Sequence, residues 1–163
     1  MNNNTFNLDQ IDLQILRLMQ ENARINNADI ARELGMAPSG ILERVKKLEQ
    51  KNVILRYNAQ INPAAVGQKL LAFIFIKAND GLGSPETAKA LAAIPEVQEV
   101  HDIAGDDGYL VKVRTQDSST LVDLIRNSFS QIPTIISTRT TIVLDTMKEE
   151  HQVIINTNFS EKC

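Results

Sequence analysis

The spacing of apolar residues changes near residue 53, and this change limits what the chain can fold into. Before it, apolar side chains recur every three or four positions, as they do on the buried face of an α-helix. After it, short runs of β-branched and aromatic residues alternate with helical stretches. The sequence therefore predicts an α+β protein, in which a helical N-terminal part is followed by a part that is built on a sheet.

The N-terminal part is predicted to hold three helices, over residues 8–22, 27–35 and 38–51. Asn27 can cap the second helix, because an asparagine side chain accepts a hydrogen bond from a backbone N–H in the first turn. Gly35 ends that helix, since glycine takes the left-handed conformation without steric cost. A short second helix and a tight turn before the third are typical of a helix-turn-helix.

The third helix is the predicted DNA-recognition helix. Ile41, Val45 and Leu48 share its inward face, so the side chains between them face outward. Residues near the start of a recognition helix contact base edges, and later cations contact phosphates. Arg44 suits a phosphate or a guanine, because its guanidinium is a planar fork of donors. The candidate DNA-binding residues are Ser39, Gly40, Glu43, Arg44, Lys46 and Lys47.

Charge is unevenly distributed along the chain. The formal net charge is -3. Residues 1–62 nevertheless hold eight basic and seven acidic residues, and five of the basic ones lie between Arg44 and Arg56. A local basic stripe matters more for DNA binding than the charge of the whole protein does. The stripe alone would fit a solvent-exposed helix face that binds nothing equally well.

The second part is predicted to follow the order β-α-β-β-α-β, which is that of a ferredoxin-like fold. Four strands and two helices leave one face of the sheet bare, so we expect two copies of the chain to pair through it. Ser118 is the expected cap of the second helix. The strands are predicted over residues 70–78, 97–105, 109–115 and 136–144, and the helices over 85–94 and 118–129.

These elements predict two domains and a tail. Residues 1–62 form a helix-turn-helix (winged-helix-like) DNA-binding domain, which ends in a strand or an extended connector over residues 53–63. Residues 63–150 form the ferredoxin-like domain, through which we expect the chain to dimerise. Residues 151–163 form a C-terminal tail that either packs on a neighbour or is partly disordered.

Other sequence features narrow the setting in which the protein works. No stretch approaches about 18 consecutive apolar residues, and the N-terminus lacks the basic and apolar regions of a secretory signal. The single cysteine, Cys163, cannot form an intramolecular disulfide and suits a reducing compartment. We expect a cytoplasmic protein with no membrane contact, no metal and no cofactor.

The segment AGDDGY joins two predicted strands and has two interpretations. Asp-Asp-Gly favours a hairpin turn, with Gly108 at a positive φ angle. The same loop exposes backbone N–H groups that could hold the carboxylate of a small ligand, while Asp106 or Asp107 holds its ammonium group. The candidate effector-binding residues are Gly105, Asp106, Asp107, Gly108, Tyr109 and Thr138.

The N-terminal part resembles the DNA-binding domain of the Lrp/AsnC family of transcription regulators. The shared features are the LDxxDxxIL opening, the NAR link, the IAxxLG second helix and the PSxxxxRVKxLE third helix. The stretch PEVQEVHDIAGDDGYLVKV resembles the family's effector domain. The resemblance implies a regulator that binds double-stranded DNA, dimerises through its C-terminal domain, often forms octamers and commonly responds to amino acids. It assigns the DNA role to Ser39, Arg44, Lys46 and Lys47.

Three positions depart from the family pattern. Ala37 stands where a Ser or Thr cap is usual, which should weaken the cap by roughly 1 kcal/mol. Glu43 stands where a basic residue is common, and it could either read a cytosine amino group or weaken phosphate affinity. Gly108 stands where the family's loop has an acid; Asp107 could substitute for that acid, or the ligand is not an amino acid.

Two alternatives to a DNA-binding regulator are considered. Siroheme decarboxylases resemble the same two-domain family, but they need histidine and cationic residues around a tetrapyrrole. This chain has only His101 and His151, and it retains a basic third helix. A DNA-free metabolite sensor would make the outward face of that helix dispensable. We therefore expect a regulator that is not an enzyme.

Overall fold

The computed structural model describes residues 7–79 and 85–156. The chain forms two compact units, one of residues 1–60 with 150–163 and one of residues 61–149. No helix in the described ranges is long and apolar enough to cross a membrane. Cys163 and the end of the predicted tail lie outside the described residues.

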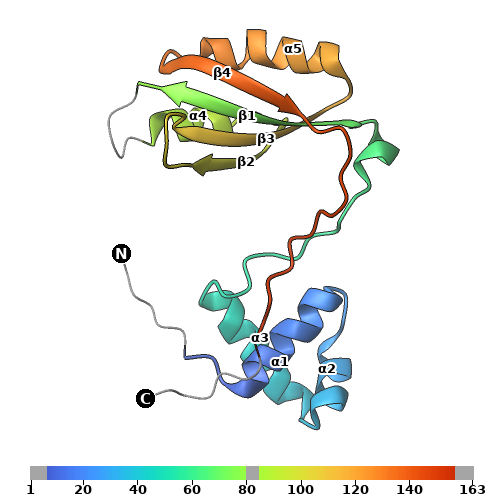
Figure 1. The fold of residues 1–163 in the computed structure, drawn as a ribbon. Helices are drawn as coiled ribbons and strands as arrows, with labels where there is room; N and C mark the ends of the chain where they lie inside the picture. Colours follow the sequence, from blue (N-terminus) through green and yellow to red (C-terminus); the bar gives the residue numbers. More distant parts are fainter. Residues whose placement is uncertain (1–6, 80–84, 157–163) are drawn as a thin grey trace. The chain divides into compact units, whose positions relative to one another are not determined.

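Three helices make up the core of the first unit, as the sequence predicts. They are α1 (Gln10–Glu21), α2 (Asn27–Leu34) and α3 (Pro38–Gln50) (Figure 1). Their spacing of apolar residues buries one face of each helix against the other two. The buried residues are Ile15, Ile30, Ala31, Ile41, Val45 and Leu48.

The ends of these helices mostly follow the predicted turn chemistry. Gly35 has a φ angle of 65° and ends α2 in the left-handed conformation. The cap of α2 is Asn26 rather than the predicted Asn27, because Asn27 already belongs to the helix. The Asp29 N–H donates to Asn26 Oδ1 over 2.9 Å. Ala37 makes no side-chain cap at the start of α3, as its missing hydroxyl predicts.

A charged bridge joins α3 to the start of α1. Arg44 Nη1 lies 2.6 Å from Asp9 Oδ2 and 2.7 Å from Asp12 Oδ1. Asp9 is also the cap of α1, since the Asp12 N–H donates to Asp9 Oδ1 over 2.8 Å. Partial burial raises the pKa of Asp9, but the Asp12 N–H and the Arg44 guanidinium outweigh it, so this pKa lies below its ordinary value.

The second unit is a four-stranded sheet with two α-helices, and it confirms the predicted α+β, ferredoxin-like order. The strands lie in the order β2-β3-β1-β4, and every neighbouring pair is antiparallel. In chain order the elements are η1 (Pro63–Val66), β1 (Leu70–Ala78), α4 (Glu86–Ala92), β2 (Val97–Asp102), β3 (Tyr109–Thr115), α5 (Ser118–Asn127), η2 (Phe129–Gln131) and β4 (Ile135–Ile142).

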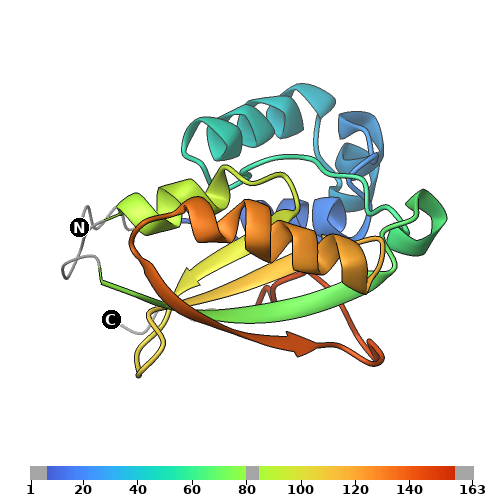
Figure 2. The same ribbon diagram turned by 90° about the horizontal axis from the view of Figure 1, so that it is seen from above.

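The two faces of this sheet differ in what covers them. Helices α4 and α5 pack on one face (Figure 2), where Ile74, Ile76 and Val111 are fully buried. Phe73 and Phe75 alternate onto the opposite face and are only partly buried. We call this opposite side the open face. The described residues of the unit place no helix on it.

In the second unit and its connector, one detail corrects a sequence-based expectation and another decides between two alternatives. Asp117, not Ser118, caps α5, because its carboxylate accepts the Thr120 N–H over 2.9 Å. Residues 53–62, all of them described, pair with no strand, so of the two alternatives only the extended connector is present. The connector lacks a neighbouring strand that could satisfy its backbone groups as a ladder.

The described residues that follow the sheet, up to residue 156, bond to α1 of the first unit. Gln20, on α1, holds them through both ends of its side-chain amide. Gln20 Nε2 donates to the Val153 carbonyl over 2.8 Å, and the Val153 N–H donates to Gln20 Oε1 over 2.9 Å. Gln152 Nε2 adds a bond of 3.0 Å to the Gln20 carbonyl. Pairing with α1 therefore holds Gln152 and Val153, for which the sequence left both packing and disorder open.

The missing cap of α3 predicts that Ala37→Ser stabilises the protein. The backbone of Ala37 is already extended, at φ -74° and ψ 140°, so a serine hydroxyl could accept an N–H from the first turn without rearrangement. We expect the free energy of unfolding to rise by about 1 kcal/mol, measured by urea denaturation. Asn26→Ala, which removes an existing cap, should lower it by a similar amount. Equal stability of Ala37→Ser and the wild type would contradict the view that the missing cap of α3 costs stability.

The Arg44 bridge predicts a pH-dependent loss of stability in Arg44→Gln. We expect a loss of about 1 kcal/mol at neutral pH, because both carboxylates lose their cation. Since the pKa of Asp9 is lowered in the folded state, its contribution is present above its unfolded pKa and disappears as the pH falls through the folded pKa. The difference between variant and wild type should therefore shrink in acid below about pH 4.

Urea denaturation at neutral and acidic pH measures this difference. Arg17→Gln is the matched control, because Arg17 pairs with Glu21 at 3.5 Å while both side chains are well exposed. An exposed pair of this kind contributes little. A pH-independent loss in Arg44→Gln would mean that the side chain acts by packing rather than through Asp9.

Candidate DNA interface and effector loop

The outward face of α3 is set by the three residues that the helix buries. Ile41, Val45 and Leu48 are at most 6% exposed, so the opposite side of the helix faces solvent. Helical geometry places a stripe along the middle of that side, at spacings of four, three and four residues. The stripe consists of Ser39, Glu43, Lys46 and Gln50, all of them exposed.

Three of these stripe residues are among the predicted DNA-binding candidates, and Gln50 is not. The exposed position of Gln50 at the end of the stripe identifies it as a further candidate. Its amide can pair with both hydrogen-bonding atoms of an adenine edge. A helical-wheel projection of the whole third helix would have identified Gln50 from the sequence.

The other candidates flank this stripe. Lys47 is exposed, while Gly40 is half-buried beside Met36. Arg44 has 31% of its side chain exposed, and its contacts are with Asp9 and Asp12. Its DNA contact therefore stays a prediction, and the role seen in the structure is to hold α3 against α1.

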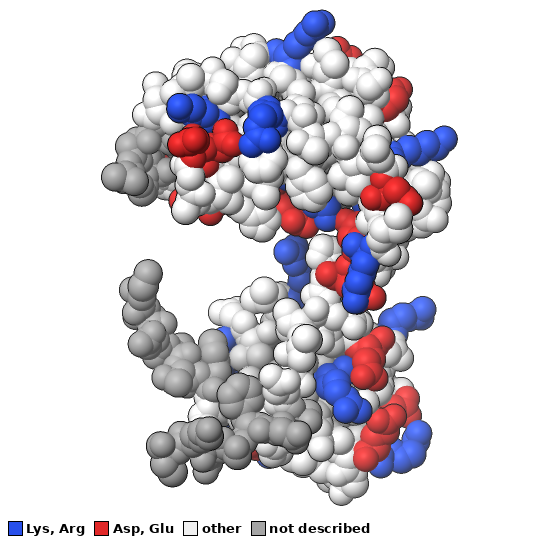
Figure 3. All heavy atoms as spheres, viewed as in Figure 1, with Lys and Arg blue, Asp and Glu red and all other residues white. Residues whose placement is uncertain are grey.

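Acidic and basic side chains lie next to one another on the face seen in Figure 3. Among the described residues on this face, neither sign forms a broad field that would attract DNA by itself. Local arrangement on α3, rather than the charge of the whole molecule, is what qualifies this unit to bind DNA.

The predicted effector loop takes a different backbone conformation from the one expected. Gly105 has a φ angle of 133°, whereas Gly108 is not among the residues with positive φ. The prediction of a positive φ at Gly108 is therefore wrong. Gly108 leads into β3, where its carbonyl accepts the Ile103 N–H over 3.0 Å. A Cβ added there would lie 3.9 Å from the Ile76 carbonyl, so the site has room for a side chain.

Asp107 already has a partner in this loop. Its Oδ2 lies 2.8 Å from Arg139 Nη2, on β4. The Arg139 guanidinium also lies 4.1 Å from the centre of the Phe75 ring, a cation–π distance. Asp106 is exposed. Between the two candidate acids, Asp106 is thus the better placed to meet an ammonium group.

Tyr109 and Thr138 lie on the face of the sheet that the helices cover. Tyr109 on β3 and Thr138 on β4 each pair with Ile76 on the central strand β1, so the three residues lie side by side on the same face of the sheet. Tyr109 is 8% exposed and belongs to the core. The Asp107–Arg139 pair lies on the open side, beside Phe75. The six predicted effector residues therefore do not converge on one face.

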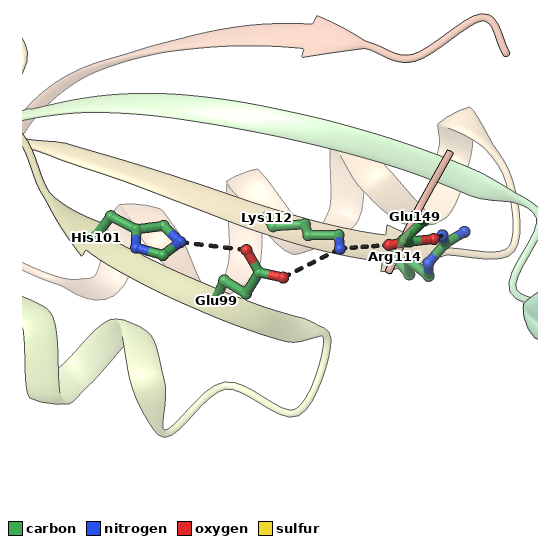
Figure 4. A network of polar contacts seen from close by, with 5 residues as sticks. All are labelled: Glu99, His101, Lys112, Arg114 and Glu149. Carbon is green, nitrogen blue, oxygen red and sulfur yellow. Dashed lines mark hydrogen bonds and ion pairs between the residues drawn. The ribbon is translucent and has the colours of Figure 1, made fainter. Parts of the chain in front are cut away.

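A network of charged side chains occupies the open face, and the sequence interpretation missed it (Figure 4). Lys112 Nζ lies 3.1 Å from Glu99 Oε1 and also pairs with Glu149. Arg114 pairs with the second oxygen of Glu149. His101 Nε2 lies 3.2 Å from Glu99 Oε2. The signal available in the sequence is the alternation of Lys112 and Arg114 along a predicted strand.

The network compensates for the burial of a lysine. The side chain of Lys112 is only 9% exposed, and burial by itself lowers its pKa. Glu149 and Glu99 more than reverse this effect, so the pKa of Lys112 lies above its ordinary value. The hydrogen bond from Lys112 lowers the pKa of Glu149 in turn. Glu149 is thereby fixed to the sheet as the charged partner of two cations.

Within the described residues, no group of three His, Cys, Asp or Glu side chains is placed to hold a metal ion. The side chain of His101 is 54% exposed and pairs with Glu99.

Two family sequence models match the two parts of the chain. Residues 8–54 match a winged helix-turn-helix DNA-binding domain, and residues 71–153 match the Lrp/AsnC ligand binding domain. Together they span most of the chain.

Individual proteins agree with these matches. The leucine-responsive regulatory protein of Escherichia coli is 34% identical over 154 residues, which cover 92% of this chain and 93% of that protein. A feast or famine regulatory protein from M. tuberculosis, solved with L-methionine, has a TM-score of 0.82 at 32% identity, covering 90% of this chain and 99% of that one. A transcriptional regulator from Neisseria meningitidis, also solved with L-methionine, has a TM-score of 0.84 at 25% identity, covering 91% and 97%. The chain belongs to the Lrp/AsnC family of transcription regulators.

Proposed function

We propose that this protein regulates transcription as a homo-oligomer in the cytoplasm, binding DNA through α3 and responding to an amino acid. The observation that carries the proposal is the exposed polar stripe on α3, in a helix-turn-helix joined to an Lrp/AsnC ligand-binding domain. Relatives that match nearly the whole chain are named as regulators, which favours this function over the siroheme-decarboxylase-like enzyme and over a DNA-free sensor.

The effector is proposed to be an amino acid held by the loop of residues 103–108. Two structurally similar regulators were solved with L-methionine, which makes that compound the first to test. Backbone N–H groups of the loop would hold the carboxylate, and Asp106 would face the ammonium group. Asp107 is less suited to that task, because Arg139 already holds it.

The open face of the sheet is proposed to form the dimer. Phe73 and Phe75 are left partly buried on this face, and no helix covers it in the described part of the unit. The face also holds the charged network of Lys112, and the apolar surface that Phe73 and Phe75 leave beside it is stabilised when a second layer packs there. A two-fold dimer would present two copies of α3 to a pseudo-palindromic site. Assembly beyond the dimer, to an octamer, is part of the same proposal.

Effector binding is proposed to reach α1 and α3 through the two segments that join the units. The first segment is the connector of residues 53–62, which is held at α3, where the Tyr57 hydroxyl donates to Glu49 Oε1 over 2.8 Å. Burial and this bond raise the pKa of Tyr57 to about 12, so the hydroxyl keeps its proton. The second segment begins at Glu149, which is held by Lys112, and reaches α1 at Gln20. Each segment therefore ends on a helix of the DNA-binding unit.

Fluorescence anisotropy on DNA from upstream of the protein's own gene tests the main proposal. We expect tighter binding to this DNA than to a scrambled duplex at the same salt concentration, and a change in affinity when L-methionine or a mixture of amino acids is added. Equal binding to both duplexes would count against the regulator and favour the enzyme or the DNA-free sensor.

Gly105→Ala tests the loop as the effector site. The φ angle of 133° at Gly105 is strained for any residue with a Cβ, so the loop should change shape and lose its ligand. Gly108→Ala is the matched control, because it makes the same chemical change in the same loop without a positive φ. We expect Gly105→Ala to abolish the effector response while DNA binding without effector is retained. A normal dose response in Gly105→Ala would place the effector elsewhere.

Gln20→Ala tests the second connecting segment. It removes both side-chain bonds to Val153 and leaves the outward face of α3 unchanged. We expect near wild-type DNA affinity without effector and a smaller shift when the effector is added, measured by anisotropy. Gln14→Ala, an exposed glutamine on the same helix, is the control. An unchanged effector shift in Gln20→Ala would exclude this segment as the route.

A further inference from the structure

Glu43 occupies the middle of the α3 stripe, where a negative charge is unfavourable for DNA binding. The DNA backbone carries about one negative charge per 1.7 Å of helix axis, and protein cations supply most of the non-specific attraction. An exposed carboxylate on the same surface opposes that attraction. Helix α3 holds one other acid, Glu49, whose Oε1 accepts the Tyr57 hydroxyl beside the connector. Only Glu43 among the acids of α3 therefore faces the DNA.

The Glu43 carboxylate has no ion pair or hydrogen bond among the described residues. Lys46 and Lys47 lie three and four residues further along the helix, at spacings where ion pairs can form, but neither pairs with Glu43 in the structure. Arg44 is held by two carboxylates of α1. Both oxygens of Glu43 are therefore available as acceptors at the centre of the recognition surface.

The major groove limits what such an acceptor can bind. An ionised carboxylate has no proton to donate, so it needs a donor on the base edge. Guanine and thymine offer acceptors at their hydrogen-bonding atoms, and adenine offers a donor next to the N7 acceptor, which repels a carboxylate. Cytosine offers its N4 amino group as a donor without an acceptor on the same base beside it. Cytosine is thus the base that best fits Glu43.

We propose that Glu43 specifies a cytosine in each half-site of the DNA recognised by this protein. The inference rests on the proposed function, since it names one base that the same α3 surface reads. Lys46 and Lys47 supply the positive charge that brings the helix to the backbone, and Glu43 restricts where it binds. The carboxylate lowers affinity for every other sequence and so raises the ratio of specific to non-specific binding.

The experiment selects bound duplexes from a randomised library with the purified full-length protein. Wild type, Glu43→Gln and Glu43→Ala are compared at one salt concentration, and the recovered DNA is sequenced. We expect the wild type to prefer cytosine at one position of each half-site by roughly tenfold. Glu43→Gln should shift that position towards adenine, because a glutamine amide pairs with both the N6 and N7 atoms of adenine. Glu43→Ala should lose the preference there and bind non-specific DNA more tightly.

Glu49→Gln is the matched control, because it makes the same chemical change on the same helix away from the stripe. It keeps an acceptor for Tyr57 and should select the same sequences as the wild type. Identical base preferences in the wild type, Glu43→Gln and Glu43→Ala would overturn the inference and leave the proposed function standing. A wild type that selects no sequence at all would overturn both.

Discussion

The burial of Ile41, Val45 and Leu48 determines how the DNA-binding unit can work. These three side chains are inaccessible or nearly so, and they lie along one line of α3. Packing them against α1 and α2 fixes the rotation of α3 about its own axis, because any other rotation would expose apolar surface and bury charge. The identity of the outward residues then follows from helical geometry alone. The Arg44 bridge to α1 adds a polar restraint to the same orientation.

In the second unit, the open face of the sheet is not covered by the unit's own helices, and it carries a buried lysine. A lysine as buried as Lys112 is stable only when its charge is paired. Glu99 pairs with it from β2, and Glu149 does so from the segment that leaves the sheet. The ion pair between Lys112 and Glu149 therefore compensates for the burial of the lysine and also anchors the segment that leads to Gln20. The segment from Glu149 to Val153 is thus held at one end by Lys112 of the sheet and at the other end by Gln20 of α1.

The sequence predicted what depends on neighbouring residues and missed what depends on distant ones. Helix positions, the order of strands and helices along the chain and the turn at Gly35 follow from periodicity and backbone preference, which act over a few residues. Asn26 and Asn27 have the same chemistry, and only the backbone conformation tells which one is the cap. The prediction of a positive φ angle at Gly108 is wrong, because the Asp-Asp-Gly turn pattern does not show that this conformation lies at Gly105. The bonds of Arg44 to Asp9 and of Gln20 to Val153 join residues 35 and 133 positions apart, and no periodic signal encodes them.

The charge of the protein explains why assembly should matter to its function. Residues 1–62 hold eight basic and seven acidic residues, so one helix-turn-helix has little net charge with which to attract DNA over a long range. An acid in the middle of its recognition helix weakens that attraction further. Joining two such units makes the second contact intramolecular, which can raise the combined affinity by about 10²–10⁴-fold without a new contact. The proposed dimer therefore supplies affinity that charge does not. A regulator built in this way would be controlled most effectively by an effector that changes its assembly or the spacing of its two copies of α3.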